Sequence, residues 1–214
     1  MRVQPKPWIG LSIAIGYLLI ILVTTLLILD DPGRFPSVRW ALLHQVLPVG
    51  IGIVFLVIAT SWLGWWRPAL FERERKRLPW WLWILPLFFA GGAIFNFVNA
   101  DRSAIPIEAM LAIAAGTVCI AFAEELAFRG GLLVGLRARF NEWIVWLVSS
   151  LVFASAHLLN VAFGDSLPQV LGQVAFAFGM GSVFYVTRRL TGTLFGAMLL
   201  HFLWDYAGFF QPSS

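Results

Sequence analysis

Long apolar runs, separated by short polar segments, make up most of the chain. A helix needs about 20 mostly apolar residues to cross the hydrocarbon core of a bilayer. Seven segments meet this requirement, at residues 8–29, 48–66, 80–99, 107–130, 142–163, 168–187 and 192–210. The pattern therefore predicts an all-α fold, a polytopic bundle of about seven transmembrane helices.

Two segments near the start of the chain, the first apolar run and residues 37–46, can each be interpreted in two ways. The first apolar run could be a secretory signal, but its length of about 22 residues exceeds the 7–15-residue apolar region of a signal. The Leu29-Asp30-Asp31 segment that follows also lacks the small residues of a cleavage site. We therefore expect a retained helix. We expect the segment Ser37–Val46 to form a short interfacial helix, not a further span.

The composition supports a membrane protein. Of the 214 residues, 60% are hydrophobic and 12% are charged, and the mean hydropathy is +0.84. Soluble domains are typically about 45–50% apolar and about 25% charged. Cys119 is the single cysteine, so an intrachain disulfide is excluded, and we expect it to pack as a small apolar residue.

The basic residues predict how the chain is oriented. If the N-terminus is cytoplasmic, the cytoplasmic segments hold twelve of the 15 basic residues, namely Arg2, Lys6, Arg67, Arg73, Arg75, Lys76, Arg77, Arg129, Arg137, Arg139, Arg188 and Arg189. The opposite face holds only Arg34, Arg39 and Arg102. Positive charge is retained on the cytoplasmic side of membrane proteins. We therefore expect a cytoplasmic N-terminus, the bilayer as a partner, and no binding of nucleic acid. The short chain is prokaryotic-looking, so we expect a prokaryotic cell (inner) membrane.

Tryptophans cluster near the ends of the apolar segments. Trp residues are enriched where a membrane protein meets the interface between lipid and water. We expect this anchoring role for Trp8, Trp62, Trp65, Trp66, Trp80, Trp81 and Trp143.

Ionisable residues within the apolar segments are the main clue to function. Glu124, Glu125 and Arg129 lie in the fourth segment, and the fifth contains His157. A charged side chain at the centre of a spanning helix costs about 2.5–3.5 kcal/mol even on lenient scales, so such residues usually mark a functional site. The seventh segment adds two more polar residues, His201 and Asp205. The sequence thus predicts a polar site between three helices.

The spacing of these residues predicts which of them are neighbours. Residues four apart share a helix face, so Glu125 is expected beside Arg129, and His201 beside Asp205. Glu124 is rotated by about 100° from Glu125. One glutamate is therefore expected in a cavity, and the other is expected to pair with Arg129.

The histidines raise two further expectations. Asp205 is placed to orient the ring of His201, and Asn160 could orient the ring of His157 in the same way. On the predicted boundaries, Glu124 and His157 are offset along the membrane normal by roughly 10 Å. A tilted helix, or a fourth span that continues past Gly130-Gly131 toward Leu136, could bring them level.

Three motifs occur in order on consecutive segments: Glu124-Glu125-x-x-x-Arg129, Phe153-x-x-x-His157 and His201-x-x-x-Asp205. This set resembles the motifs of the CPBP family of intramembrane proteases, which is named for CAAX prenyl proteases and bacteriocin-processing enzymes and is also called Abi. The resemblance covers residues 107–210. It implies a catalytic core of four helices there, preceded by three helices, in residues 1–106, that carry no family signature.

The resemblance also implies an activity, an endopeptidase that hydrolyses a peptide bond of a membrane-associated substrate. By this resemblance Glu124 and His157 activate water, and His201 and Asp205 stabilise the oxyanion. Members have been described both as glutamic proteases and as metalloproteases. If a divalent metal such as zinc is used, Glu124, His157 and His201 are its expected ligands. The resemblance does not identify the peptide or protein substrate, nor whether that substrate is prenylated.

Two other functions are compatible with the same residues. A non-catalytic immunity or partner-binding protein could use the fold to bind a peptide without cutting it. A small proton-coupled transporter could use intramembrane carboxylates and histidines as a relay. Transporters commonly contain two related halves with interrupted helices, and this sequence has no such duplication.

Overall fold

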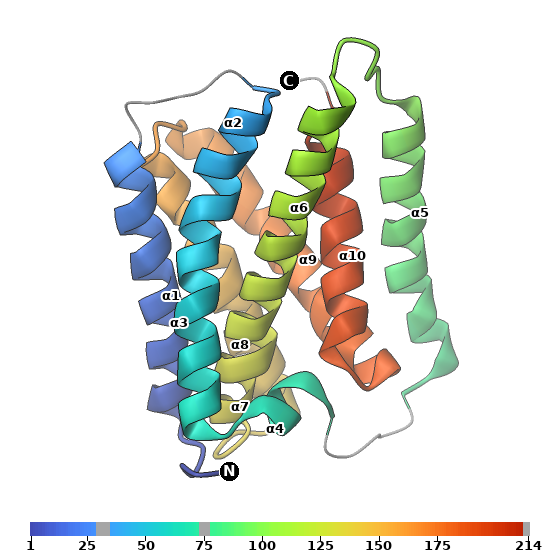
Figure 1. Ribbon diagram of the computed structural model, residues 1–214. Coiled ribbons are helices and arrows are strands. Elements are labelled where there is room, and N and C mark those ends of the chain that lie inside the picture. Colours follow the sequence, from blue (N-terminus) through green and yellow to red (C-terminus); the bar gives the residue numbers. More distant parts are fainter. Residues whose placement is uncertain (29–34, 73–77, 212–214) are drawn as a thin grey trace.

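The computed structural model describes residues 1–28, 35–72 and 78–211. Its helices, in chain order, are α1 (Pro7–Ile28), α2 (Val38–Ala41), η1 (Leu42–Val46), α3 (Leu47–Leu63), α4 (Trp66–Leu70), η2 (Trp80–Trp83), α5 (Ile84–Asn99), α6 (Ile107–Glu124), η3 (Glu125–Leu132), α7 (Leu133–Leu136), α8 (Glu142–Ala156), η4 (His157–Val161), α9 (Leu167–Thr191) and α10 (Leu194–Gly208) (Figure 1). Within these residues the only β-type pairing is one isolated bridge, Phe71 to Thr193. The predicted all-α bundle is confirmed.

Six helices in the described part of the chain are long and apolar enough to cross a membrane. They are Pro7–Ile28, Val38–Leu63, Trp80–Asn99, Ile107–Leu136, Glu142–Val161 and Leu167–Thr191. The seventh predicted span corresponds to α10, which has 15 residues. At 1.5 Å per residue α10 is only about 22 Å long. It lies inside the bundle and packs against α5, α6 and α9 (Figure 1).

The second span begins earlier than the sequence predicted. Residues 38–46 do not form a separate interfacial helix, because α2, η1 and α3 join into one helix of 26 residues, Val38–Leu63. The Ser37 side chain caps its start by accepting a hydrogen bond from the backbone N–H of Trp40 (3.1 Å). Pro48 cannot donate a backbone hydrogen bond, and the π-helical turn η1 directly precedes it. The helix therefore continues through a proline that would otherwise interrupt it.

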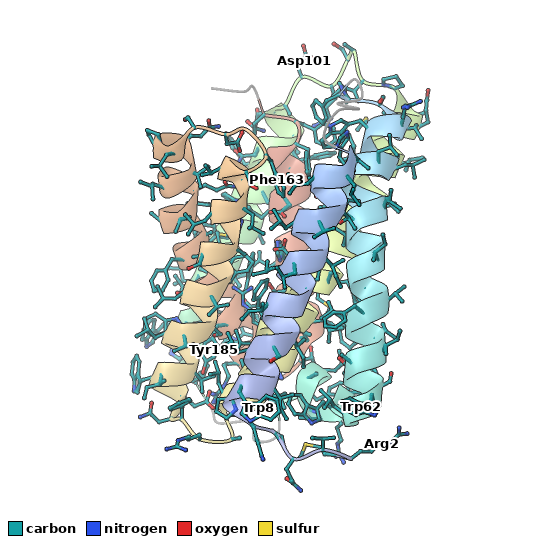
Figure 2. The ribbon with its side chains drawn as sticks, turned by 90° about the vertical axis from the view of Figure 1, so that its left-hand side faces the viewer. Arg2, Trp8, Trp62, Asp101, Phe163 and Tyr185 are labelled. Atoms are coloured by element: carbon teal, nitrogen blue, oxygen red, sulfur yellow. The ribbon has the colours of Figure 1, made fainter. Side chains whose placement is uncertain are left out.

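The two ends of the bundle differ in charge. The N-terminus, α4 and α7 lie at one end, and the last turn of α10 lies at the other (Figure 1). Arg2, Trp8 and Trp62 are seen at the first end and Asp101 at the opposite end (Figure 2). The position of Arg2 agrees with the predicted separation of basic residues (Figure 2), whereas Arg129, which was counted on the same side, is buried within the bundle. Arg34 and the basic residues at 73, 75, 76 and 77, like Leu29-Asp30-Asp31, lie outside the described residues. The cytoplasmic assignment of the first end stays a prediction.

One of the expected interfacial tryptophans is part of the core. Trp8 and Trp62 are exposed, as an anchoring role requires. Trp65 is buried, and its indole N–H donates to the backbone carbonyl of Val3 (2.8 Å). The Trp65 side chain thus ties the N-terminal segment to the end of α3, so its predicted role at the interface is wrong.

Helix α1 is held tightly against the segment that follows α6. Gly10 on α1 faces Gly135 on α7 so closely that a Cβ atom added to Gly135 would lie 2.8 Å from the Cα atom of Gly10. Small residues permit such close approach of membrane helices. Further along α1, the Tyr17 ring packs edge-on against Phe128 of η3 (6.3 Å between ring centroids). Helix α1 therefore forms one wall of the region that contains the paired glutamates.

Candidate active site

A π-helical segment separates the environments of the two adjacent glutamates. Glu124 is the last residue of α6, and Glu125 begins the π-helix η3. π-Helical segments are rare and often occur at functional sites. The side chain of Glu124 is 25% exposed, whereas that of Glu125 is fully buried. The predicted division of roles, with one glutamate in a cavity and the other in an ion pair, is therefore present in the geometry.

Glu125 forms a buried ion pair with Arg129. An Arg129 Nη1–H donates to Glu125 Oε1 (2.9 Å), and both side chains are inaccessible to solvent. The guanidinium carbon lies 3.9 Å from the centroid of the Phe153 ring, a cation–π arrangement. Gly181 on α9 leaves room for this group, since a Cβ atom there would lie 2.8 Å from Arg129 Nη2. The predicted i, i+4 pairing is confirmed.

His201 is held between carboxylates from two helices. Its Nδ1 lies 3.1 Å from Glu125 Oε1, and its Nε2 lies 3.2 Å from Asp205 Oδ2. Carboxylate oxygens accept hydrogen bonds, so the ring is placed to donate from both nitrogens. The ring also stacks on Phe184 (4.6 Å between centroids). The expected orienting role of Asp205 agrees with this geometry, whereas sequence spacing gave no indication of the contact with Glu125.

His157 is held by a backbone carbonyl and not by Asn160. Its Nδ1 lies 3.2 Å from the carbonyl oxygen of Phe153. A carbonyl can only accept, so this contact puts a hydrogen on Nδ1, and in the neutral ring Nε2 is then the acceptor. The Asn160 side-chain amide instead donates to Gln173 Oε1 (2.7 Å). The suggested Asn160–His157 contact is therefore wrong, because the carbonyl four residues earlier lies on the same helix face.

One cavity brings together four of the six predicted site residues. Its volume is about 200 Å³, and its polar lining includes Glu124, His157, His201 and Asp205. Glu124 and His157 share this cavity, and the fourth span does continue past the glycine pair, as one 30-residue helix from Ile107 to Leu136. Glu125 and Arg129 lie behind the cavity and support His201.

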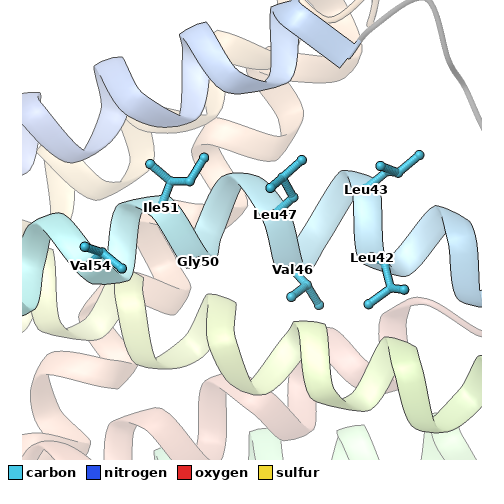
Figure 3. Close-up of a pocket in the computed structure, with 7 residues that line it drawn as sticks. All are labelled: Leu42, Leu43, Val46, Leu47, Gly50, Ile51 and Val54. Carbon is cyan, nitrogen blue, oxygen red and sulfur yellow. The ribbon is translucent and has the colours of Figure 1, made fainter.

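A larger hollow elsewhere offers no comparable chemistry. It has a volume of about 470 Å³ and is lined by Leu42, Leu43, Val46, Leu47, Gly50, Ile51 and Val54 of η1 and α3 (Figure 3). All of these residues are apolar, and several are exposed on the surface that faces lipid in a membrane-spanning bundle. Of these two hollows, only the one of about 200 Å³ is lined by acid–base groups.

The three suggested metal ligands do not fit a zinc site as they are arranged. A ligating histidine needs a free nitrogen lone pair, but both nitrogens of His201 face carboxylate oxygens. Among the residues that the structure describes, no three His, Cys, Asp or Glu side chains are grouped as a metal ion would need. The arrangement instead resembles an acid–base site, with an accepting imidazole and a carboxylate on one side and a donating imidazole on the other.

A second ion-pair network contacts the π-helix η3 through the backbone carbonyl of Arg129. The sequence did not predict this network. Arg188 is buried near the end of α9, and it donates to the backbone carbonyls of Arg129 and Ala69 and to Glu72 Oε1 (2.6 Å). Arg137 also contacts Glu72 (2.9 Å). Burial alone raises the pKa of Glu72, but Arg188 and Arg137 hold that pKa below its usual value. Arg188 had been counted only as a loop charge; its actual role depends on contacts between distant segments.

The fold and this cavity define a class, a multi-pass membrane protein with a polar acid–base site enclosed by its helices. Residues 106–207 match the family model described as type II CAAX prenyl endopeptidase Rce1-like. The matched segment contains all six predicted site residues. It is a domain of the CPBP (Abi) family, so the resemblance seen in the motifs is confirmed. A search of curated proteins and a search of solved structures each found no match.

Proposed function

We propose that this protein is an intramembrane endopeptidase that hydrolyses a peptide bond of a membrane-associated protein. The matching family is one of proteases. The observation that carries the proposal is the cavity shared by three side chains: the partly exposed Glu124 carboxylate, the His157 ring with Nε2 as its acceptor, and the His201 ring as a donor.

In the proposed reaction, a water molecule lies between Glu124 and His157. One of these groups takes a proton as the water oxygen attacks the carbonyl carbon of the substrate. The resulting tetrahedral centre carries a negative oxygen. When the C–N bond breaks, the same proton passes to the leaving nitrogen, and the products are a carboxylic acid and an amine.

His201 donates to the negative oxygen by sharing the Nε2–H that faces Asp205 Oδ2 in the structure. Its Nε2 lies 3.8 Å from Glu124 Oε2, so it borders the space where water would be activated. Donors fixed in advance at this position stabilise charge that develops in the transition state. Glu125 and Arg129 act as positioning residues, since they contact His201 and Phe153 but do not line the cavity.

The proposed substrate is a membrane-associated peptide. The family name refers to prenylated substrates, and nothing in the cavity lining requires a prenyl group. Location in a prokaryotic cell membrane stays a prediction from the short chain.

The proposal is tested by comparing protein termini in membranes from cells that express wild type, Glu124→Gln or Glu108→Gln. Glu108 is an exposed acid at the start of the same helix, so its variant is the matched control. We expect a new terminus with wild type and Glu108→Gln that is lost with Glu124→Gln. A cellular effect of the protein that persists in Glu124→Gln, without any such terminus, would favour the partner-binding alternative.

A further inference from the structure

Glu124 and His157 line a second, smaller cavity as well as the one already described. This cavity has a volume of about 100 Å³. Its remaining lining comes from α1 and from the end of α8 with η4 and the residues after it: Tyr17, Leu18, Ile21, Ala156, Leu159, Asn160 and Phe163. The two cavities thus meet at the two residues proposed to activate water.

The linings of the two cavities differ in chemistry. The larger one carries His201, Asp205 and Gln173. Apart from Glu124 and His157, the smaller one is lined mainly by aliphatic and aromatic carbon. Phe163 lies beside α1 in the half of the bundle away from Arg2 and Trp8 (Figure 2). The smaller cavity therefore favours an apolar group.

The wall that α1 contributes is held in a fixed position. Tyr17 is buried between Phe128 of η3 and Gly52 of α3. A Cβ atom added to Gly52 would lie 2.7 Å from the Tyr17 ring. The contact between Gly10 and Gly135 fixes α1 at a second point, nearer the N-terminus of that helix. A wall fixed at two levels can discriminate between side chains by size.

We infer that the two cavities receive the two sides of the cleaved peptide bond, and that the smaller one binds an aliphatic side chain next to that bond. This inference rests on the proposed function. A peptide whose carbonyl lies at Glu124 and His157 has access to both cavities, because these two residues line each of them. A cavity of about 150 Å³ is known to bind benzene, so one of about 100 Å³ suits a branched aliphatic side chain better than an aromatic ring.

This assignment gives α1 a role in recognition. Helix α1 lies outside residues 106–207, the segment that matches the family. Leu18 and Ile21 are then specificity-determining residues that the family motifs do not contain. Side-chain preference can accordingly differ between proteins that share the same catalytic motifs.

The test uses purified protein in proteoliposomes and apolar, lysine-flanked decapeptides that carry a fluorophore and a quencher. Five peptide pools hold Gly, Ala, Val, Leu or Phe at one fixed position within a degenerate apolar window, and mass spectrometry locates each cut. Ile21→Phe and Leu18→Phe fill the cavity, and Ile21→Ala enlarges it. Leu19→Phe is the matched control, because Leu19 is exposed on the outer face of α1.

We expect wild type and Leu19→Phe to prefer Val or Leu next to the cut. One methylene in an apolar pocket changes kcat/KM by about 10- to 200-fold. The filled variants should therefore lower the Leu-to-Ala ratio of kcat/KM by about 10-fold or more, and Ile21→Ala should raise the Phe-to-Leu ratio. Thermal unfolding of each variant separates a folding defect from a change in preference.

Two failures are distinguishable. If wild type cuts in a Glu124-dependent manner but Ile21→Ala, Ile21→Phe and Leu18→Phe leave the preference unchanged, the subsite assignment is wrong and the endopeptidase proposal stands. If wild type shows no cleavage that Glu124→Gln abolishes, the proposed function fails and this inference fails with it.

Discussion

A single oxygen of Glu125 contacts both Arg129 and His201. Glu125 Oε1 lies 2.9 Å from Arg129 Nη1 and 3.1 Å from His201 Nδ1. Through this atom the π-helix η3 and the helix α10 are joined inside the bundle, 76 residues apart in sequence. The contact positions the His201 ring with its other nitrogen toward Asp205 and the cavity.

Glu125→Gln is predicted to destabilise the protein. The change removes the charge that faces Arg129 and His201, and removal of one partner from a buried ion pair typically costs about 3–5 kcal/mol. Thermal unfolding in detergent measures the effect, with Glu108→Gln as the matched control. Equal stability of the two variants would show that the buried pair contributes nothing to the fold.

Gly181→Ala is predicted to displace the Arg129 guanidinium. The new Cβ atom would lie 2.8 Å from Arg129 Nη2 and 3.2 Å from the Phe153 ring, and overpacking of this kind costs about 1–3 kcal/mol. Gly179→Ala is a matched control on the same helix, because nothing lies within 4 Å of its added Cβ atom. We expect a lower melting temperature for Gly181→Ala only. Loss of stability in both variants, or in neither, would contradict the role given to Gly181.

His157→Ala is predicted to abolish cleavage and to preserve the fold. The described hydrogen bond of the ring is local, to the carbonyl of Phe153, whereas its Nε2 is proposed to act on water. Loss of an acid–base group typically lowers the rate by about 10²- to 10⁴-fold. Turnover and melting temperature are measured together, and His44→Ala provides a histidine control outside the cavity, with its ring near Trp40. A large fall in melting temperature without a specific loss of turnover would assign His157 a structural role.

The ion pairs of Glu72 predict how stability depends on pH. Its pKa is lowered in the folded protein by Arg188 and Arg137, against the effect of burial. A lowered pKa gives stability that is fully present above the unfolded value of about 4.5 and is lost as the pH falls through the folded value. We expect acidification below about pH 4.5 to lower the melting temperature of wild type more than that of Glu72→Gln. The same acid sensitivity in both proteins would mean that Glu72 does not contribute.

The sequence predicted those parts of the site that lie within one helix. Glu125–Arg129 and His201–Asp205 follow from four-residue spacing, and the structure contains both contacts. Glu125–His201 and Arg188–Glu72 depend on how separate helices pack, which spacing along one helix cannot reveal.

Backbone irregularities account for further differences from the prediction. The fourth segment was predicted to end near Gly130, with a continuation past Gly130 and Gly131 toward Leu136 as an alternative. Both glycines lie inside the π-helix, and the helix continues to Leu136. In the second span, the π-helical turn before Pro48 likewise extends the helix toward its N-terminus, to Val38.

The central claim, that Glu124 and His157 act on the same water molecule, is tested most directly by a double-mutant cycle. The rate of peptide cleavage is measured for purified wild type, Glu124→Gln, His157→Ala and the double variant. Residues that act as a unit give strongly non-additive losses, so we expect the double variant to lose little more activity than either single variant. Losses that multiply, or turnover that persists in Glu124→Gln, would contradict the mechanism.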